Sequence, residues 1–112
     1  MPGLSRPDRE PGSEPGPEPE PEPGGVRRHV WVRGRVQNVW FRDGCAREAE
    51  RLGVAGWVTN RPDGRVEAVF EGAQEAVATI EAWCHRGPTR ARVEHVEART
   101  EAPTGERGFA IR

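Results

Sequence analysis

The chain has 112 residues, 17 basic and 18 acidic side chains, and a net charge of −1. A chain of this length holds at most one modest domain, and its near-neutral charge does not by itself indicate a nucleic-acid partner. The two cysteines, Cys45 and Cys84, are far apart in the sequence and match no metal-ligand spacing, so we expect two reduced, packed thiols.

Residues 1–25 differ in composition from the rest of the chain. They are mostly Pro, Glu and Gly, with Leu4 as the one aliphatic residue. Such a segment buries too little apolar surface to fold, so we expect it to be disordered. It has no apolar stretch of the kind found in signal peptides or membrane anchors, so we expect a cytoplasmic protein without membrane contact. The domain is then residues 26–112, where fifteen arginines against twelve acids give +3, a charge that suits a small anionic ligand.

The first two predicted elements are a strand and a helix. Val30 and Val32 alternate with residues of the other face, which predicts a half-buried strand over 29–33. The apolar spacing then becomes helical from Trp40 to Leu52, and a glycine follows at the expected end of the helix.

The remaining elements are a hairpin, a second helix and two more strands. Strands are predicted at 55–60 and 65–71 around the turn 61–64, a helix at 73–86, and strands at 91–100 and 108–112. This order predicts an α+β, ferredoxin-like split βαβ fold (βαββαβ), in which two helices cover one face of an antiparallel sheet. The fold alone names no function, because it serves RNA binders, metal carriers, ligand sensors and enzymes.

The junction between the first strand and the first helix, GRVQNVWFR at 34–42, has the composition of an anion site. Backbone N–H groups of a tight loop and of a helix's first turn together form a concave array of donors. Gly34 permits an unusual backbone angle or a close approach, and Asn38 tolerates the left-handed region. Arg42 projects from the first helical turn, where its guanidinium can bind two phosphoryl oxygens. Taken alone, the pattern fits an ordinary loop glycine and surface arginine equally well.

The same stretch resembles the acylphosphatase signature, a G-x-V-Q-G-V-x-F-R run that links a first strand to a first helix. The resemblance continues in the same order through almost all of residues 26–112. It includes GWVTN (56–60), the PDG turn followed by RVEAVFEG (62–72), GPTRARVEHVE (87–97) and GFAIR (108–112).

The resemblance implies roles for particular residues. Arg42 would hold the substrate phosphate, and Asn60 would position the attacking water, although Asn60 alone also fits a turn residue opening the loop 61–64. The loop whose backbone amides cradle the phosphate corresponds to six residues: Arg35, Val36, Gln37, Asn38, Val39 and Trp40. Asn38 replaces the second glycine of the family pattern, and we expect the cradle to survive because asparagine adopts the left-handed conformation at modest cost.

The implied reaction is the hydrolysis of a small-molecule acyl phosphate to a carboxylate and inorganic phosphate. Its leaving group is a carboxylate that departs without a proton, so positioning and charge stabilisation suffice and no general acid is required. We therefore expect no metal and no cofactor. Neither catalytic side chain titrates between about pH 5 and 8, so the rate should be nearly flat there. We expect a monomer with broad acyl specificity and no nucleic-acid partner.

Three other functions share this order of elements. An RNA-binding module stacks bases on aromatic residues of its first and third strands, and the third strand offers only Phe70. A metal carrier needs a C-x-x-C motif in the first loop, where this chain has Val36 and Asn38. A non-catalytic anion-binding or partner-interaction module is favoured only by Asn38 and the acidic segment. Trp40 fits either packing or contact with the acyl group of the substrate, and the other three tryptophans are interpreted as packing residues.

Overall fold

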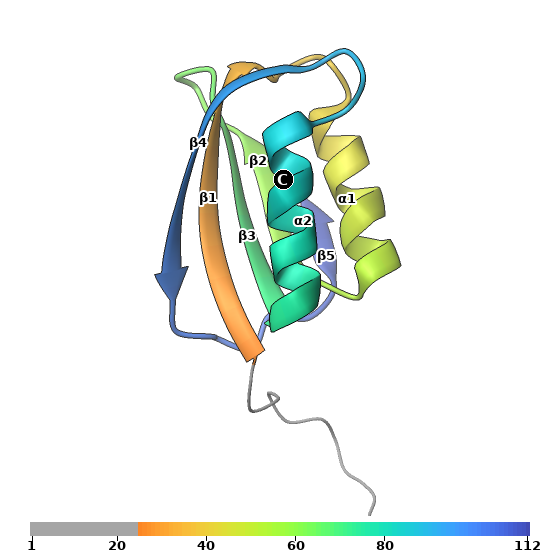
Figure 1. The fold of residues 1–112 in the computed structure, drawn as a ribbon, viewed down its shortest axis with the longest axis vertical. Coiled ribbons are helices and arrows are strands. Elements are labelled where there is room, and N and C mark those ends of the chain that lie inside the picture. The colour runs from red at the N-terminus through yellow and green to blue at the C-terminus, as the bar shows by residue number, and fades with distance from the viewer. Residues whose placement is uncertain (1–24) are drawn as a thin grey trace, which may run out of the picture.

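A computed structural model describes residues 25–112 (Figure 1). The disorder predicted for residues 1–25 falls, apart from Gly25, outside the described residues. Within them the chain forms β1 (Gly25–Arg35), α1 (Phe41–Leu52), β2 (Ala55–Asn60), β3 (Val66–Ala73), α2 (Gln74–Arg86), β4 (Arg92–Glu101) and β5 (Phe109–Ile111). The predicted order of elements is confirmed.

The strands form one five-stranded sheet in the order β4-β1-β3-β2-β5. β3 is central and pairs antiparallel with β1 and β2, and β1 also pairs antiparallel with β4. β5 is the exception, because it pairs with β2 in parallel, so the sheet is mixed where the sequence predicted a wholly antiparallel one. Three residues at a sheet edge carry no signal for strand direction, which the path of the connection after β4 determines.

Both helices pack on the same face of the sheet, as predicted (Figure 1). Val30 and Val32 of β1 and Phe70 of β3 point into the layer between the sheet and the helices, where they meet the buried faces of α1 and α2. Cys45 of α1 and Cys84 of α2 belong to this core, and both thiols are free and buried. Contact with Cys45 and burial together raise the pKa of the Cys84 thiol, which keeps it protonated and unreactive.

The opposite face of the sheet carries a small aromatic cluster that the sequence did not predict. The His29 ring stacks on Trp31 with centroids 4.1 Å apart and meets the edge of Trp57 at 5.9 Å. Arg99 covers the Trp31 ring at 5.0 Å, and Arg112 covers the Trp57 ring at 4.7 Å. The chain's own side chains therefore occupy the aromatic surfaces of this face.

His29 also lies between two carboxylates. Its Nδ1 is 2.7 Å from Glu101 and its Nε2 is 2.6 Å from Glu67. His29 of β1 thus contacts a carboxylate of β3 through one ring nitrogen and a carboxylate of β4 through the other. No local pattern in the sequence predicts this arrangement, because Glu67 and Glu101 lie in strands that are distant from His29 along the chain.

Glu71 fixes the connection between β4 and β5. Its carboxylate accepts hydrogen bonds from the backbone N–H groups of Thr104 (3.2 Å), Gly105 (2.7 Å) and Glu106 (3.3 Å), and from Arg27 (3.1 Å). Burial by itself would raise the pKa of Glu71, but these hydrogen bonds outweigh burial and the pKa lies below its ordinary value. The ionised carboxylate therefore anchors the connection that leads into β5.

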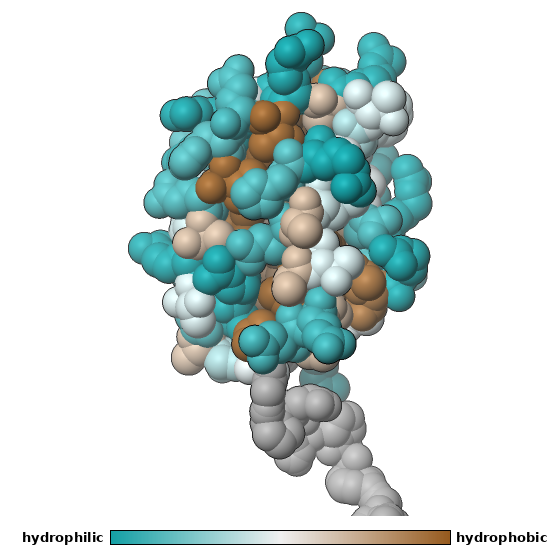
Figure 2. All heavy atoms as spheres, in the orientation of Figure 1, coloured by the Kyte–Doolittle hydropathy of each residue, from teal (hydrophilic) through white to brown (hydrophobic). Residues whose placement is uncertain are grey.

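Hydrophilic side chains cover most of the face seen in Figure 2, and the apolar residues on it form small separate groups. Among residues 25–112, no helix combines the length and the apolar composition needed to cross a membrane.

Candidate active site

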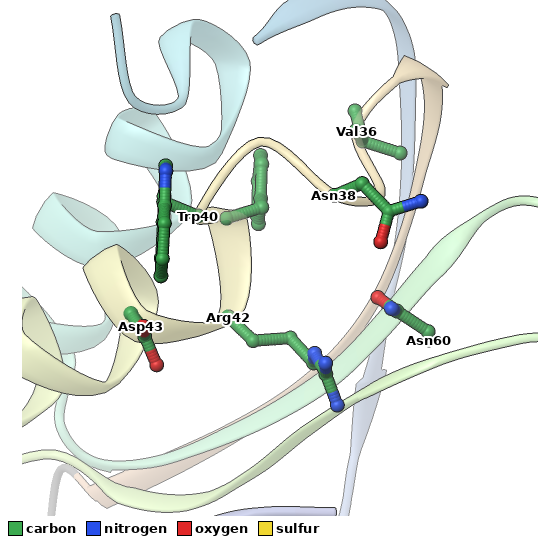
Figure 3. A pocket seen from close by; sticks show the side chains of 7 residues that line it. Val36, Asn38, Trp40, Arg42, Asp43 and Asn60 are labelled. Carbon is green, nitrogen blue, oxygen red and sulfur yellow. The ribbon is translucent and has the colours of Figure 1, made fainter. Parts of the chain in front are cut away.

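A cavity of about 310 Å³ opens where β1 passes into α1 (Figure 3). Its walls come from the loop after β1, the first turn of α1 and the last residue of β2. The lining residues are Val36, Asn38, Trp40, Phe41, Arg42, Asp43 and Asn60. The two side chains to which the sequence assigned catalytic roles, Arg42 and Asn60, thus lie in one cavity, although 18 positions separate them.

The loop leaves the sheet through a β-bulge at Gly34. The register between β1 and β4 shifts between Arg33 and Gly34, and Gly34 has φ 135°. A Cβ atom at Gly34 would clash with the main-chain oxygen of Arg92 and would lie 2.9 Å from the nitrogen of Glu94. Only glycine therefore allows β4 to approach so closely here, which confirms the predicted role of Gly34.

Buried side chains anchor the loop to the core. Val36, Val39 and Phe41 are 1%, 7% and 2% exposed and belong to the main hydrophobic cluster. The intervening residues Asn38 and Trp40 face the solvent. These three side chains therefore anchor the loop to the core.

Two residues of the loop adopt left-handed backbone conformations. Asn38 has φ 63°, as expected for a residue in place of the family's glycine, and the conformation costs asparagine little. Trp40 has φ 70° and ψ 22° and is the N-cap of α1, so the helix begins at Phe41, one residue later than predicted. A bulky residue in this region carries strain of ~1–2 kcal/mol, and such strain concentrates at functional sites.

Arg42 lies in the first turn of α1, and its guanidinium points into the cavity (Figure 3). Its Nη1 donates a hydrogen bond to the main-chain oxygen of Arg112 at 3.2 Å. The Thr59 hydroxyl donates to the same oxygen, also at 3.2 Å. The residue that follows β5 therefore holds Arg42 on one side and leaves its other N–H groups for a ligand. No local sequence pattern predicts this contact, because Arg112 is 70 positions away.

Asn60 is the last residue of β2, and the hydrogen bonding of its side-chain oxygen is incomplete. Among the residues that the structure describes, the Asn60 Oδ1 is the one buried side-chain oxygen or nitrogen that lacks a hydrogen-bond partner. Leaving such an acceptor unpaired costs ~1–3 kcal/mol. Asn60 also lines the cavity, so its side-chain amide lies beside any molecule bound there.

Gln37 joins the loop to the β2–β3 hairpin. Its side-chain amide donates to the main-chain oxygens of Arg61 (2.8 Å) and Arg65 (3.0 Å), the two residues that close the hairpin turn directly after Asn60. Asp63 fixes the same turn, because hydrogen bonds from Arg65 and Arg61 hold the pKa of Asp63 well below its ordinary range. Gln37 therefore joins the loop to the hairpin turn that follows Asn60.

The six residues predicted for the cradle separate into two groups. Val36, Asn38 and Trp40 line the cavity. The other three do not: Arg35 is the exposed last residue of β1, the Gln37 side chain binds the hairpin, and the Val39 side chain is in the core. Phe41 and Asp43 also line the cavity, and the sequence reading missed both. Their positions on either side of Arg42 were the only available signal.

No group of three or more histidine, cysteine, aspartate or glutamate side chains within residues 25–112 is arranged to hold a metal ion. The polar side chains that line the cavity are a guanidinium, two amides and one carboxylate, with the indole of Trp40 beside them. Three of them, Asn38, Arg42 and Asn60, point towards the same space in Figure 3. This donor-rich set is suited to a phosphoryl group and a water molecule.

Comparison with known proteins gives the same family by sequence and by structure. The family model "Acylphosphatase" matches residues 28–111. The acylphosphatase of Rubrobacter xylanophilus is 60% identical over 87 residues, which cover 77% of this chain and 79% of that protein. The acylphosphatase of Roseiflexus is 56% identical over 87 residues, covering 77% of this chain and 94% of that protein.

Solved structures of acylphosphatases have the same fold. The Coxiella burnetii acylphosphatase superimposes with a TM-score of 0.77 at 32% identity, covering 80% of this chain and 94% of that one. The Bacillus subtilis acylphosphatase gives a TM-score of 0.75 at 33% identity, covering 77% of this chain and 97% of that one.

Proposed function

The chain belongs to the acylphosphatase family and hydrolyses acyl phosphates, and we propose that it does so through Arg42, Asn60 and the backbone of the loop before α1. The observation that carries this assignment of residues is the convergence of Arg42 and the unpaired Asn60 Oδ1 on one cavity.

The phosphoryl group binds between the loop and Arg42. Backbone N–H groups of the loop and of the first turn of α1 donate to its oxygens, and the positive end of the helix dipole favours its negative charge. The Arg42 guanidinium donates to two further oxygens and stabilises the charge that these oxygens carry in the transition state. Its hydrogen bond to Arg112 keeps the guanidinium oriented before the substrate arrives.

Asn60 binds the nucleophilic water. Its Oδ1 accepts a hydrogen bond from the water, which directs a lone pair of the water oxygen at phosphorus. This hydrogen bond satisfies the buried acceptor that otherwise lacks a partner. The cost of the unpaired oxygen is thus recovered when the water binds.

The reaction needs no proton transfer to or from the protein. The bond from the water oxygen to phosphorus forms while the bond from phosphorus to the acyl oxygen breaks, and the electron pair leaves with the carboxylate. Both protons of the water remain on the phosphate product. A carboxylate needs no proton to leave, so the enzyme supplies only position and charge.

The first experiment is hydrolysis of benzoyl phosphate with chelator present by the parent, Arg42→Ala, Asn60→Ala and Asn38→Gly. Arg47→Ala is the matched control, because Arg47 is exposed on the same helix and lies outside the cavity. We expect the first two variants to lose about a hundredfold or more in kcat while remaining folded, as loss of one electrostatic contact does elsewhere. The Asn38→Gly rate measures the effect of the departure from the family pattern.

A parent that is folded but inactive, with an active Asn38→Gly variant, would favour a non-catalytic anion-binding module instead. Full activity of Arg42→Ala or Asn60→Ala would refute the roles assigned to those residues.

We further propose that residues 26–112 act as a monomer in the cytoplasm without a nucleic-acid partner. The two buried, free thiols support a reducing compartment. Phe70, the third-strand aromatic on which RNA stacking would depend, is fully buried, and arginines cover Trp31 and Trp57. Size-exclusion chromatography with light scattering, with and without single-stranded RNA, tests the monomer and the absence of RNA binding together.

A further inference from the structure

Trp40 is the most exposed large apolar residue among those that the structure describes. Its exposed fraction is 66%, so packing does not explain the position of the indole. Its left-handed backbone is a further cost, because this conformation is unusual for a bulky side chain. An exposed aromatic ring held in a strained conformation at the wall of a catalytic cavity indicates contact with a ligand.

The geometry of the reaction indicates which part of the substrate contacts Trp40. In an in-line displacement, the attacking water and the leaving group lie on opposite sides of the phosphorus. Asn60, which holds the water in the proposed mechanism, lies on one side of Arg42 in Figure 3, together with Asn38. Trp40 and Asp43 lie on the other side of Arg42. With phosphorus held beside the Arg42 guanidinium, as in the proposed mechanism, the acyl carboxylate leaves away from Asn60 and therefore towards the side of Trp40.

We propose that the Trp40 indole is the contact surface for the acyl group and makes the enzyme selective for acyl phosphates with flat, apolar acyl groups. This inference rests on the proposed mechanism, because it uses the position of the water at Asn60. An indole offers a flat face on which an aromatic acyl group stacks, whereas a methyl group covers little of it. Because the indole is 66% exposed, it is accessible to acyl groups larger than acetyl.

Binding to Trp40 acts equally on the substrate and on the transition state, because the acyl group changes little until the bond to phosphorus is broken. The indole therefore lowers KM for aromatic substrates and leaves kcat unchanged. This separates Trp40 from Arg42 and Asn60, whose contacts strengthen in the transition state.

The test compares benzoyl phosphate with acetyl phosphate in the parent, Trp40→Asn and Trp40→Phe. Asparagine tolerates the left-handed conformation, so Trp40→Asn removes the ring while it keeps the backbone of the loop. Phenylalanine keeps a flat apolar ring and serves as the conservative rescue. Inhibition by inorganic phosphate reports on the phosphate cradle separately. The ratio of the two kcat/KM values cancels any effect of a variant on the cradle.

In Trp40→Asn we expect the benzoyl-to-acetyl ratio of kcat/KM to fall about fivefold through KM, which corresponds to ~1 kcal/mol. Any change that Trp40→Asn makes in the phosphate cradle affects both substrates alike and cancels in the ratio, and Trp40→Phe should keep most of the ratio. An unchanged ratio, or an equal loss with both substrates, would overturn the inference and leave the proposed function standing. A parent inactive on both substrates would overturn the proposed function itself.

Discussion

Replacing Gln37 with methionine removes the two hydrogen bonds that join the loop to the hairpin and keeps the length and shape of the side chain. The bonds, 2.8 and 3.0 Å long, end on the main-chain oxygens of Arg61 and Arg65. The Arg61 oxygen also accepts a hydrogen bond from the Gly64 N–H, and the Arg65 oxygen accepts one from the Arg61 N–H. Neither oxygen is therefore left without a donor. The loss is therefore that of two ordinary hydrogen bonds, about 1–2 kcal/mol in the free energy of unfolding.

For a domain of this size, that loss lowers the melting temperature by about 4–16 °C, at ~4–8 °C per kcal/mol. The catalytic effect is larger, because the hairpin carries Asn60 and a displacement of about 1 Å in a positioned group costs about a hundredfold. We therefore expect kcat to fall by about ten- to a hundredfold, with the inhibition constant of inorganic phosphate close to the parent value.

The assay is steady-state hydrolysis of benzoyl phosphate beside thermal unfolding followed by circular dichroism. Gln74→Met is the matched control, because Gln74 is an exposed glutamine at the start of α2, remote from the cavity. Gln37→Glu is a second probe, since a carboxylate of the same length cannot donate to the two oxygens. If Gln37→Met keeps kcat within twofold of Gln74→Met, Gln37 does not position Asn60.

Three further predictions concern stability and pH. Glu71→Gln should lower the free energy of unfolding by about 2–4 kcal/mol, since one amide group cannot accept from four donors, while Glu97→Gln at an exposed site changes it little. Because the pKa of Glu71 is lower in the folded state, its contribution to the free energy of unfolding is complete above about pH 5 and disappears as the pH falls through the folded pKa. The free energies of unfolding measured in urea at pH 7 and pH 3 should therefore differ less in Glu71→Gln than in the parent. Gly34→Ala should cost about 3 kcal/mol in chemical denaturation and reduce activity, because its Cβ pushes β4 away from the base of the loop. The kcat of the parent should stay nearly flat from about pH 5 to 8, and a single titration near the pKa of histidine would show that a histidine takes part.

Local patterns in the sequence were enough for the elements of the fold. The apolar residues alternate over residues 29–33, as in a strand with one buried face. Over residues 40–52 they recur with the period of a helix that has one buried face. The ends of elements were less accurate. β1 runs from Gly25 to Arg35, longer than predicted, because pairing with β3 and β4 on both sides extends it beyond its apolar residues.

The sequence by itself also determined the family, since the signature and the motifs after it stand in order along the domain. It anticipated the left-handed Asn38, because the preference of asparagine for that conformation is a property of the residue alone.

Only the tertiary structure decided how the site is held together. The hydrogen bonds of Gln37 to the hairpin and of Arg42 to Arg112 join positions at least 24 residues apart, and the strand pairing, which no local pattern encodes, fixes both. The exposure of Trp40 was equally unreadable, because an aromatic residue beside apolar neighbours has the same pattern whether it packs or faces a cavity. Local sequence reports the burial of an element, whereas the contacts between elements depend on how the whole sheet aligns them.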